Sequence, residues 1–436
     1  YTYSRQNIID PSIHPEIRTR KDDPALNASI GQPISASTPH TALTPQLDVL
    51  IIGAGLSGLV AGWQASHSGK KTRVIAKGWG ANHWGSGCID VLGYLPGKPS
   101  QVVVSPSGSM QDLIQSNPTH PYALIGIDRV EQALVDFCSS FEQTGYPLYG
   151  SFQRNWLLPT ALGAIRPTCL APQSMIAGDV QSPGPMLIVG FSQYQDFFAG
   201  LVADNLNAQQ ILARELTLDL PVLQEARIVS TMTLARLFDS PEFRYLVAQK
   251  VLPRLGSATR VGFPAVLGLD SSLVALHDLE DQLGVPVFEI PGLPPSIPGI
   301  RLHTLLVRAI QTAGGQVYSG MQVQGSEVID KLVINVFSEA AARQKSHPAK
   351  NYILATGGFL GGGFIAQENG YAQETIFGLN LNNLSNTAGT EIDSSPREEH
   401  PILRSGIRIN PQFAPSDQFG QSILTNLCVV GSALGG

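Results

Sequence analysis

The sequence has few cysteines and no long apolar run. The four cysteines, Cys88, Cys138, Cys169 and Cys428, lie far apart and form no CxxC pair. Iron–sulfur or zinc ligation within this chain is therefore not expected, and no metal site is predicted. No apolar stretch approaches the roughly 20 residues that a membrane-spanning helix needs. The formal net charge is −6 and no basic block stands out, which argues against nucleic-acid binding.

Glycine and proline, by contrast, are abundant. The chain contains 44 glycines and 31 prolines, and 43% of its 436 residues are hydrophobic. This length predicts two or three domains, joined and shaped by many tight turns. Residues 1–46 are an exception, because six prolines, four basic and four acidic residues leave no apolar periodicity there. We expect these residues to form an extended polar arm.

The segment after the arm has the pattern strand, glycine turn, helix, strand. Residues 49–52 are a short apolar run typical of a buried parallel strand, residues 56–68 fit a helix, and residues 72–76 fit a second strand. This βαβ unit is typical of a dinucleotide-binding domain. Its first glycine permits the tight turn, the second lets the backbone approach a phosphate, and the third packs the helix on the strand. The predicted cofactor-binding residues of this turn are Gly53, Ala54, Gly55, Leu56, Ser57 and Gly58.

Lys77 stands at the end of this unit, where a carboxylate usually binds the ribose diol of an adenosine. A lysine has only hydrogen-bond donors, whereas the diol binds best to an acceptor. Three interpretations follow: an FAD whose adenosine is held by other groups, an NADP whose 2′-phosphate faces the lysine, or a mononucleotide without adenosine. A solvent-exposed lysine beside an ordinary FAD is the structural alternative.

Further glycine clusters follow other predicted strands. They lie in residues 85–87, in ATGGFLGGG (residues 355–363) and in GSALGG at the end of the chain. Strand-terminal glycines spread over the whole sequence fit a long cofactor bound by a discontinuous domain, which favours a flavin over NADP. The additional predicted cofactor-binding residues are Lys77, Ser86, Gly87, Thr356, Gly357, Gly358, Gly431 and Ser432.

The rest of the chain predicts a mixed α/β organisation. Apolar spacing predicts helices over residues 130–141, 194–206, 241–251 and 302–313, and strands over residues 316–322, 352–356 and 426–430. Residues 338–350 are polar and predict a solvent loop or a hairpin. The predicted fold is a Rossmann-like flavin-binding domain assembled from residues 47–150 and 315–436, with a second mixed α/β domain inserted at residues 151–314.

Several motifs occur in an order that resembles a known family. They are GAGLSGL, GANHWGSGCIDVLGYLP, HPYALIG, PGLPPSIPGIRL, LATGGFLGGG and TNLCVVGSALGG. Together they resemble the B subunit of the anaerobic glycerol-3-phosphate dehydrogenase, within the fumarate reductase/succinate dehydrogenase-type flavoprotein superfamily. The resemblance covers residues 47–436 and leaves the N-terminal arm outside. The PPSxxGIRL and GSxLGG pieces are specific to the family, whereas GxGxxG is not.

The resemblance implies a flavin-dependent dehydrogenase, or a subunit of one. The flavin is FMN by family resemblance, with FAD as the alternative, and a basic residue at Lys77 fits the mononucleotide. The implied partners are an FAD-bearing catalytic subunit and an iron–sulfur membrane-anchor subunit, through which electrons from glycerol 3-phosphate reach the quinone pool. The implied location is cytoplasmic, at the inner face of the cell membrane through these partners. The family also implies a glycine-rich segment and a final helix after GSxLGG, which are expected beyond Gly436.

Two residues are predicted to take part in catalysis. Arg301, in PPSIPGIRL, offers a planar fork for an anionic substrate group or the flavin's negative charge, or alternatively braces the helix that begins there. His83 lies in the loop expected near the flavin ring and is the candidate base, with a hydrogen-bonded loop histidine as the alternative. His303 points to a different helical face from Arg301 and is interpreted as structural. A stand-alone flavin dehydrogenase of a small hydroxy acid or dicarboxylate, and a non-catalytic electron-relay subunit, are the alternative functions.

Overall fold

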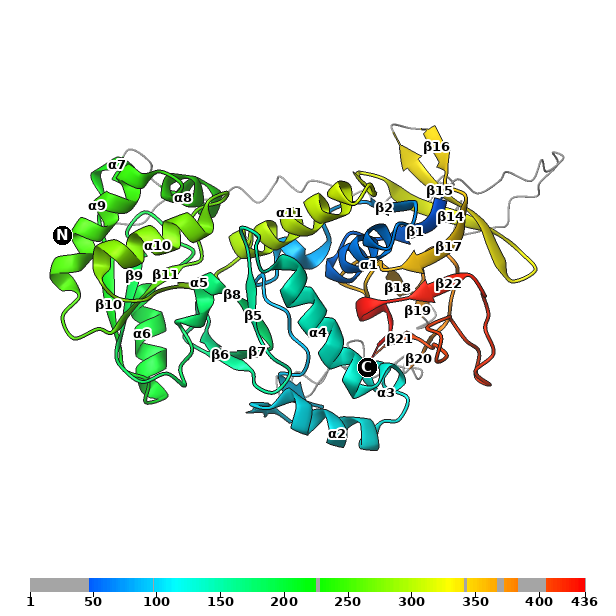
Figure 1. Cartoon of the computed structure of the whole chain (residues 1–436), viewed down its shortest axis with the longest axis horizontal. Helices are drawn as coiled ribbons and strands as arrows, with labels where there is room; N and C mark the ends of the chain where they lie inside the picture. The colour runs from blue at the N-terminus through cyan, green and yellow to red at the C-terminus, as the bar shows by residue number, and fades with distance from the viewer. Residues whose placement is uncertain are drawn as a thin grey trace, which may run out of the picture. The chain divides into compact units, whose positions relative to one another are not determined.

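The computed structural model describes residues 47–96, 98–224, 228–340, 343–366, 372–382 and 405–435. The predicted N-terminal arm lies outside the described residues. The described residues contain two parallel sheets of four or more strands, and helices pack against each of them (Figure 1). Within the described residues, no helix is both long and apolar enough to cross a membrane.

The first sheet has five parallel strands, gathered from distant parts of the chain. Their order across the sheet is β13-β2-β1-β17-β22. In register, Val49 pairs with Thr72 and Leu47 pairs with Ala349, while Tyr352 pairs with Leu427. The strands are β1 (Leu47–Ile52), β2 (Thr72–Ala76), β13 (Gln316–Ser319), β17 (Ala349–Leu354) and β22 (Leu427–Val429). All their carboxyl ends therefore lie along one edge of the sheet, where α/β proteins bind ligands.

The two faces of this sheet contribute to two different apolar cores. Ile51 and Val74 pack with the helices α1 (Leu56–His67) and α11 (Ile297–Thr312). Leu50 and Ile75 point the other way and pack with residues of β15 (Leu332–Ala340). This alternation follows from the period of two along a strand. The helix α1 lies very close to the sheet, because a Cβ at Gly62 would be 2.7 Å from Val74 Cγ2.

The second sheet has four parallel strands in the order β10-β9-β11-β12. They are β9 (Met186–Phe191), β10 (Ala213–Leu218), β11 (Arg260–Pro264) and β12 (Val287–Ile290). Every residue of β9, β11 and β12 is buried, as expected for parallel strands covered on both faces. The helices that share its core are α6 (Ala199–Ala208), α8 (Thr231–Phe238), α9 (Pro241–Val251) and α10 (Ser272–Leu283).

Further elements complete the described fold. The remaining α-helices are α2 (Pro106–Ser116), α3 (Pro121–Ile125), α4 (Ile127–Phe141), α5 (Gln173–Ile176) and α7 (Pro221–Gln224). The 3-10 helices are η1 (Gly80–His83), η2 (Leu252–Arg254) and η3 (Gly431–Ala433). The remaining strands are β3 (Tyr94–Leu95), β4 (Lys98–Val102), β5 (Leu148–Gly150), β6 (Trp156–Pro159), β7 (Ile165–Thr168), β8 (Leu170–Pro172), β14 (Gln322–Ile329), β16 (Arg343–Ser346), β18 (Phe364–Ala366), β19 (Ala372–Glu374), β20 (Leu381–Asn382) and β21 (Gly406–Ile407).

The structure confirms the predicted βαβ unit and corrects the bounds of several other elements. Strand β2 and helix α9 have the predicted bounds. The helix predicted from residue 194 begins at Ala199 instead, because residue 194 belongs to a backbone turn in which Tyr194 N donates to the Phe191 carbonyl at 3.0 Å. The helix predicted from residue 302 begins earlier, at Ile297, because Ser296 caps it by accepting a hydrogen bond from Gly299 N. For the polar stretch 338–350, a solvent loop or a hairpin was predicted, and the structure shows the hairpin, in which β15 pairs with β16.

A buried ion pair connects the second sheet to α11. Arg301 Nη1 lies 2.7 Å from Glu289 Oε2, and Arg301 Nη2 lies 3.0 Å from Glu289 Oε1. The same carboxylate accepts hydrogen bonds from Ser174 Oγ at 2.6 Å and Leu267 N at 2.8 Å. Arg301 also donates to the Gly268 carbonyl. Since Arg301 is 6% and Glu289 1% exposed, each charge depends on the other for compensation.

Replacing Glu289 by Gln should lower the free energy of unfolding by about 3 kcal/mol, because the Arg301 charge is left buried without its partner. Urea unfolding of the full chain measures this loss. The control is Asp48→Asn, which removes the exposed ion pair with Lys350 (2.7 Å) and should cost far less. Equal losses in the two variants would contradict a structural role for the buried pair.

Candidate functional site

The glycine turn after β1 combines tight packing with one open position. A Cβ at Gly53 would lie 2.3 Å from the Ala355 carbonyl oxygen, and a Cβ at Gly58 would lie 2.0 Å from the Gly53 carbonyl oxygen. At Gly55, in contrast, a Cβ would meet nothing within 4 Å. Gly55 is also the N-cap of α1, which has no acidic residue in its first turn. The free space and the helix N-terminus together suit a phosphate.

The ends of three strands meet at this turn. Ala355 N donates to the Ile52 carbonyl at 2.8 Å, and Val430 N donates to the Leu354 carbonyl at 3.0 Å. A Cβ at Gly431 would be 2.5 Å from Ser57 Oγ. The segments that contain the predicted cofactor-binding residues 53–58, 356–358 and 431–432 are therefore brought together at one edge of the sheet.

Thr356 carries an unused hydroxyl in this region. Its Oγ1 is buried and has no hydrogen-bond partner among the described residues. The loop after it folds back closely, since a Cβ at Gly363 would lie 2.6 Å from Thr356 Oγ1. Gly357 and Gly358 lie beside Ser432. A Cβ at Gly357 would be 3.5 Å from Ser432 Oγ, and a Cβ at Gly358 would be 3.4 Å from the Ser432 carbonyl oxygen. A buried, unpaired hydroxyl beside strand-terminal glycines is a suitable contact for a polar cofactor atom.

The segment after β2 passes directly over the glycine turn. A Cβ at Gly80 would be 2.9 Å from Gly55 Cα. Lys77 is exposed at the end of β2 and forms no ion pair within the described part of the chain. Ser86 Oγ accepts a hydrogen bond from Cys88 N at 3.4 Å. Gly87 packs tightly, because a Cβ there would lie 2.4 Å from Tyr146 Oη and 2.6 Å from Pro298 Cβ, which gives it a packing role.

His83 lies within this segment and keeps an unpaired ring nitrogen. Its Nε2 is buried and has no hydrogen-bond partner among the described residues. Burial lowers the pKa of His83 below its ordinary value, so the imidazole is neutral at pH 7. Its ring stacks on Trp79, with centroids 5.5 Å apart, and its carbonyl accepts from Ser296 N at 2.7 Å. A neutral imidazole of this kind can accept a proton.

Arg301 requires a correction. The prediction assigned its guanidinium to an anionic substrate group or to the flavin. In the structure the guanidinium is buried and bonded to Glu289 and to the Gly268 carbonyl. This arrangement favours the alternative interpretation, in which Arg301 braces α11, because its donors and its charge are already engaged inside the protein.

Sequence reasoning missed the contribution of Asn82 and His303. Asn82 Nδ2 donates to the Ala54 carbonyl at 3.2 Å and lies 3.4 Å from His303 Nδ1. His303 Nε2 is buried without a partner among the described residues. The polar residues in the glycine-rich stretch GANHWGSG were the available signal for Asn82. His303 lies on α11, far along the chain, and only the folded structure brings it here.

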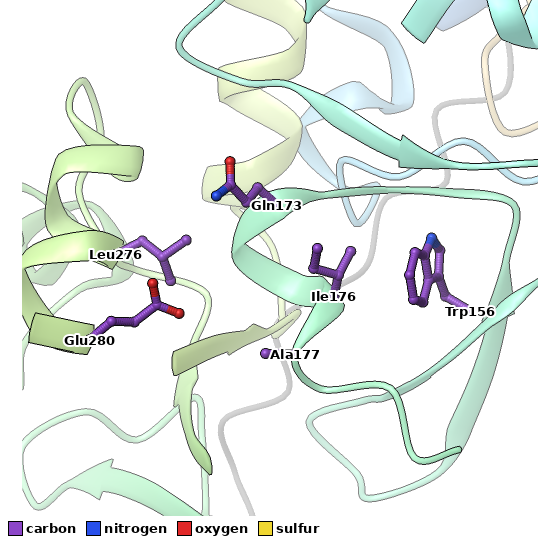
Figure 2. A pocket seen from close by; sticks show the side chains of 6 residues that line it. All are labelled: Trp156, Gln173, Ile176, Ala177, Leu276 and Glu280. Atoms are coloured by element: carbon purple, nitrogen blue, oxygen red, sulfur yellow. The ribbon is translucent and has the colours of Figure 1, made fainter. Parts of the chain in front are cut away.

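A separate pocket is lined by residues of β6, α5 and α10 (Figure 2). Its volume is about 310 Å³, and it is lined by Trp156, Gln173, Ile176, Ala177, Leu276 and Glu280. None of these is a predicted site residue. Glu280 Oε1 accepts from Val287 N at 3.1 Å, and Gln173 Nε2 lies 3.1 Å from His277 Nε2. One polar atom of each of these two side chains is thus engaged by the protein itself.

Comparison with known proteins identifies the family. Residues 48–436 match the family described as FAD binding domain. The probable anaerobic glycerol-3-phosphate dehydrogenase B subunit of Halobacterium salinarum is 32% identical over 403 residues, which are 89% of this chain and 92% of the relative. The anaerobic glycerol-3-phosphate dehydrogenase B subunit of Pectobacterium atrosepticum is 30% identical over the same shares. The chain belongs to the family of anaerobic glycerol-3-phosphate dehydrogenase B subunits.

Membership of this family and of the FAD binding domain family makes the chain a flavoprotein, so a flavin is its cofactor. The resemblance found in the sequence is confirmed, as is the Rossmann-like fold class. Among solved structures, the 3-ketosteroid-Δ4-(5α)-dehydrogenase of Rhodococcus jostii has a TM-score of 0.31 at 15% identity, covering 73% of this chain and 48% of its own.

The open space at Gly55 leads to a testable difference between two glycines of this flavoprotein. Gly55→Ala should lower the stability of the flavin-free protein by less than about 1 kcal/mol, the cost of alanine at an N-cap, and weaken flavin binding by about tenfold or more, because the methyl group occupies the space for a charged phosphate and its hydrogen bonds. Gly58→Ala should instead destabilise the flavin-free protein by about 1–3 kcal/mol, because its methyl group meets the backbone. Thermal unfolding and flavin titration separate the two effects. Similar loss of stability in both variants would contradict the assignment of Gly55.

The buried histidines predict a loss of stability at acid pH. Burial, and to a smaller extent the charges of Arg73 and Lys345, lower the pKa of His347 to about 4. Burial, and to a smaller extent the charge of His83, lower the pKa of His303 to about 4. In the unfolded chain a histidine titrates near pH 6.5. Between these values the unfolded chain binds more protons, so stability is fully present above pH 6.5 and falls toward pH 4.

The variant His347→Gln should show a shallower fall in the free energy of unfolding between pH 6.5 and pH 4 than the parent flavoprotein. Chemical unfolding at several pH values measures both slopes. Burial raises the pKa of Glu374 to about 7, so its effect on stability has the opposite sign. Because Glu374 is present in both proteins, its contribution cancels when one slope is subtracted from the other. Identical slopes would mean that His347 does not stay neutral in the fold.

Proposed function

We propose that this chain is the flavoprotein subunit of a glycerol-3-phosphate:quinone oxidoreductase, passing electrons from the oxidation of sn-glycerol 3-phosphate toward the quinone pool. The observation that carries the proposal is the similarity, at 30–32% identity over about nine-tenths of both chains, to relatives named as the B subunit of the anaerobic glycerol-3-phosphate dehydrogenase. We also propose that the predicted inserted domain, residues 151–314, is the part of the chain that faces the substrate or a partner.

The residues around the glycine turn fit a flavin. Gly55 leaves room for a phosphate at the N-terminus of α1, and Thr356 offers an unpaired buried hydroxyl. Ser57 lies beside Gly431, and Ser432 lies beside Gly357 and Gly358, so both would add polar contacts. We infer that the segments 53–58, 356–358 and 431–432 hold the flavin, with Ser86 and Lys77 at the edge of the site. The Cβ-free backbone, and not a cluster of charges, would provide most of the binding surface.

A bound flavin would supply the acceptor of two electrons when a secondary alcohol is oxidised to a ketone. The protein would then have to accept the hydroxyl proton. We propose His83 for this task, because burial keeps its imidazole neutral and its Nε2 has no partner in the described fold. Arg301 would act indirectly, by fixing the first turn of α11 against the His83 segment.

The identity of the flavin is a separate part of the proposal. The description of the matched family favours FAD. The mononucleotide interpretation, FMN, rests on the resemblance and on Lys77, which offers no acceptor for an adenosine ribose. We propose FAD as the first cofactor to test and FMN as the alternative. Releasing the flavin from the purified protein and measuring its mass decides between them.

The relatives' name as a subunit motivates the proposed assembly. We propose an FAD-bearing catalytic subunit and an iron–sulfur subunit as partners, with the quinone reached through them. The location would be the cytoplasmic face of the cell membrane, to which the partners would attach this chain.

The test compares flavin reduction by sn-glycerol 3-phosphate in the chain alone and in the assembled complex, followed as loss of the visible absorbance of the oxidised flavin. Bleaching of more flavin in the complex than the FAD-bearing partner carries, with none in the isolated chain, supports the proposed subunit. Bleaching in the isolated chain supports the stand-alone dehydrogenase. No bleaching of a flavin that stays bound under either condition would contradict the proposal.

A further inference from the structure

Four residues beside the glycine turn form a compact group, here called the imidazole cluster: Trp79, Asn82, His83 and His303. The rings of His83 and His303 meet edge to face with centroids 5.4 Å apart. Trp79 covers both rings, at 5.5 Å from His83 and 4.7 Å from His303. His303 is only 3% exposed, whereas Trp79 is 49% exposed. The cluster thus joins the buried imidazole of His303 and the partly buried imidazole of His83 under one half-exposed indole.

Each imidazole of the cluster has a buried Nε2 without a hydrogen-bond partner among the described residues. A buried polar group left unpaired costs on the order of 1–3 kcal/mol. The fold therefore loses stability at two neighbouring positions where apolar rings would avoid the loss. Unpaired buried groups in native proteins require an explanation, and a ligand that pairs with them is one.

The hydrogen bonds of Asn82 define which nitrogen of His303 carries the hydrogen. Asn82 Nδ2 donates to the Ala54 carbonyl, so the amide nitrogen, and not the amide oxygen, faces His303 Nδ1. A neutral imidazole that accepts at Nδ1 carries its hydrogen at Nε2. The unpaired atom of His303 is therefore a hydrogen-bond donor that needs an acceptor.

The position of the cluster indicates the source of that acceptor. Asn82 bonds to Ala54 of the glycine turn, and Gly80 contacts Gly55, the position left open for a phosphate. On the other side, Gly299 of α11 packs so closely that a Cβ there would be 1.8 Å from the Asn82 carbonyl oxygen. A metal ion is a poor explanation, because the described residues contain no group of three His, Cys, Asp or Glu side chains that could hold one.

We propose that His303 is a flavin-binding residue, whose imidazole donates its Nε2 hydrogen to an acceptor atom of the bound flavin. Asn82 fixes the required tautomer, and Trp79 moves aside when the flavin binds. Gly78, with open space around it, and Gly80, with a φ of 64°, flank Trp79 and permit this movement. The inference rests on the proposed function, since it takes the flavin to lie at the glycine turn.

The test separates a binding role from a structural role by measuring two properties of the full chain. His303→Phe keeps a ring but has no donor, so the flavin-free protein should unfold at the same or a higher temperature than the parent. Its dissociation constants for FMN and FAD, measured separately by flavin fluorescence, should rise about two- to tenfold for whichever flavin binds. His303→Gln places an amide N–H near the Nε2 position and should restore most of the affinity, whereas the shorter His303→Asn should not.

His347→Phe is the matched control. His347 is also fully buried, but Ser338 Oγ lies 2.8 Å from its Nε2 and Arg73 Nη1 lies 3.5 Å from its Nδ1. Removing these satisfied bonds should lower the unfolding temperature and leave the flavin affinity unchanged. The two buried histidines are thus expected to respond in opposite ways.

Parent-like flavin affinity in His303→Phe, or equal affinities in His303→Gln and His303→Asn, would overturn the inference. A fall in unfolding temperature as large as that of His347→Phe, without rescue by Gln, would assign His303 a structural role. If His303→Phe does not fold, the comparison of the Gln and Asn variants decides alone. A parent chain that binds neither FMN nor FAD would overturn the proposed function and this inference together, whereas loss of the difference between variants overturns the inference alone.

Discussion

The site depends on backbone contacts that a side chain would prevent. Gly58 lies against the Gly53 carbonyl, Gly53 against the Ala355 carbonyl, and Gly431 against Ser57. These contacts bring the ends of β1, β17 and β22 together although the three strands lie far apart in the sequence. Since most of the contacts involve backbone atoms, no rearrangement of a flexible side chain could relieve a substitution. The positions of the polar groups around the turn follow from this close approach.

The Arg301–Glu289 ion pair connects the second sheet, through α11, to the loop above the glycine turn. Glu289 lies on β12, and Arg301 lies one turn into α11, so the pair fixes the start of that helix. The first turn of α11 in turn holds the loop above the glycine turn, through Ser296 N to the His83 carbonyl and the packing of Gly299 on Asn82. A buried pair of this kind adds little net stability, but removing either partner leaves an uncompensated buried charge.

Sequence patterns predicted the parts of the site that depend on local backbone chemistry. The βαβ unit and the strand-terminal glycines are local signals, and the structure places them side by side. Arg301 and His303 show where this reasoning fails. The pairing of Arg301 depends on a strand of the other sheet, and the orphaned nitrogen of His303 depends on Asn82, more than 200 positions away. Both residues lie on one amphipathic helix, whose periodicity reports burial but not the polar partners that burial brings.

The unpaired polar groups near the glycine turn lower the stability of the fold but remain available to bind a cofactor. Ten buried side-chain atoms lack partners in the described residues, and those of His83, His303 and Thr356 lie on segments that border the glycine turn. His347, which is as deeply buried as His303 but lies just before β17, has both nitrogens engaged. Burial lowers the pKa of His83 and His303 and so keeps both rings neutral near pH 7. A neutral imidazole retains one donor and one acceptor nitrogen, which a charged one would not. The same burial that costs folding free energy therefore preserves, beside the cofactor position, the chemistry that a neutral histidine can offer.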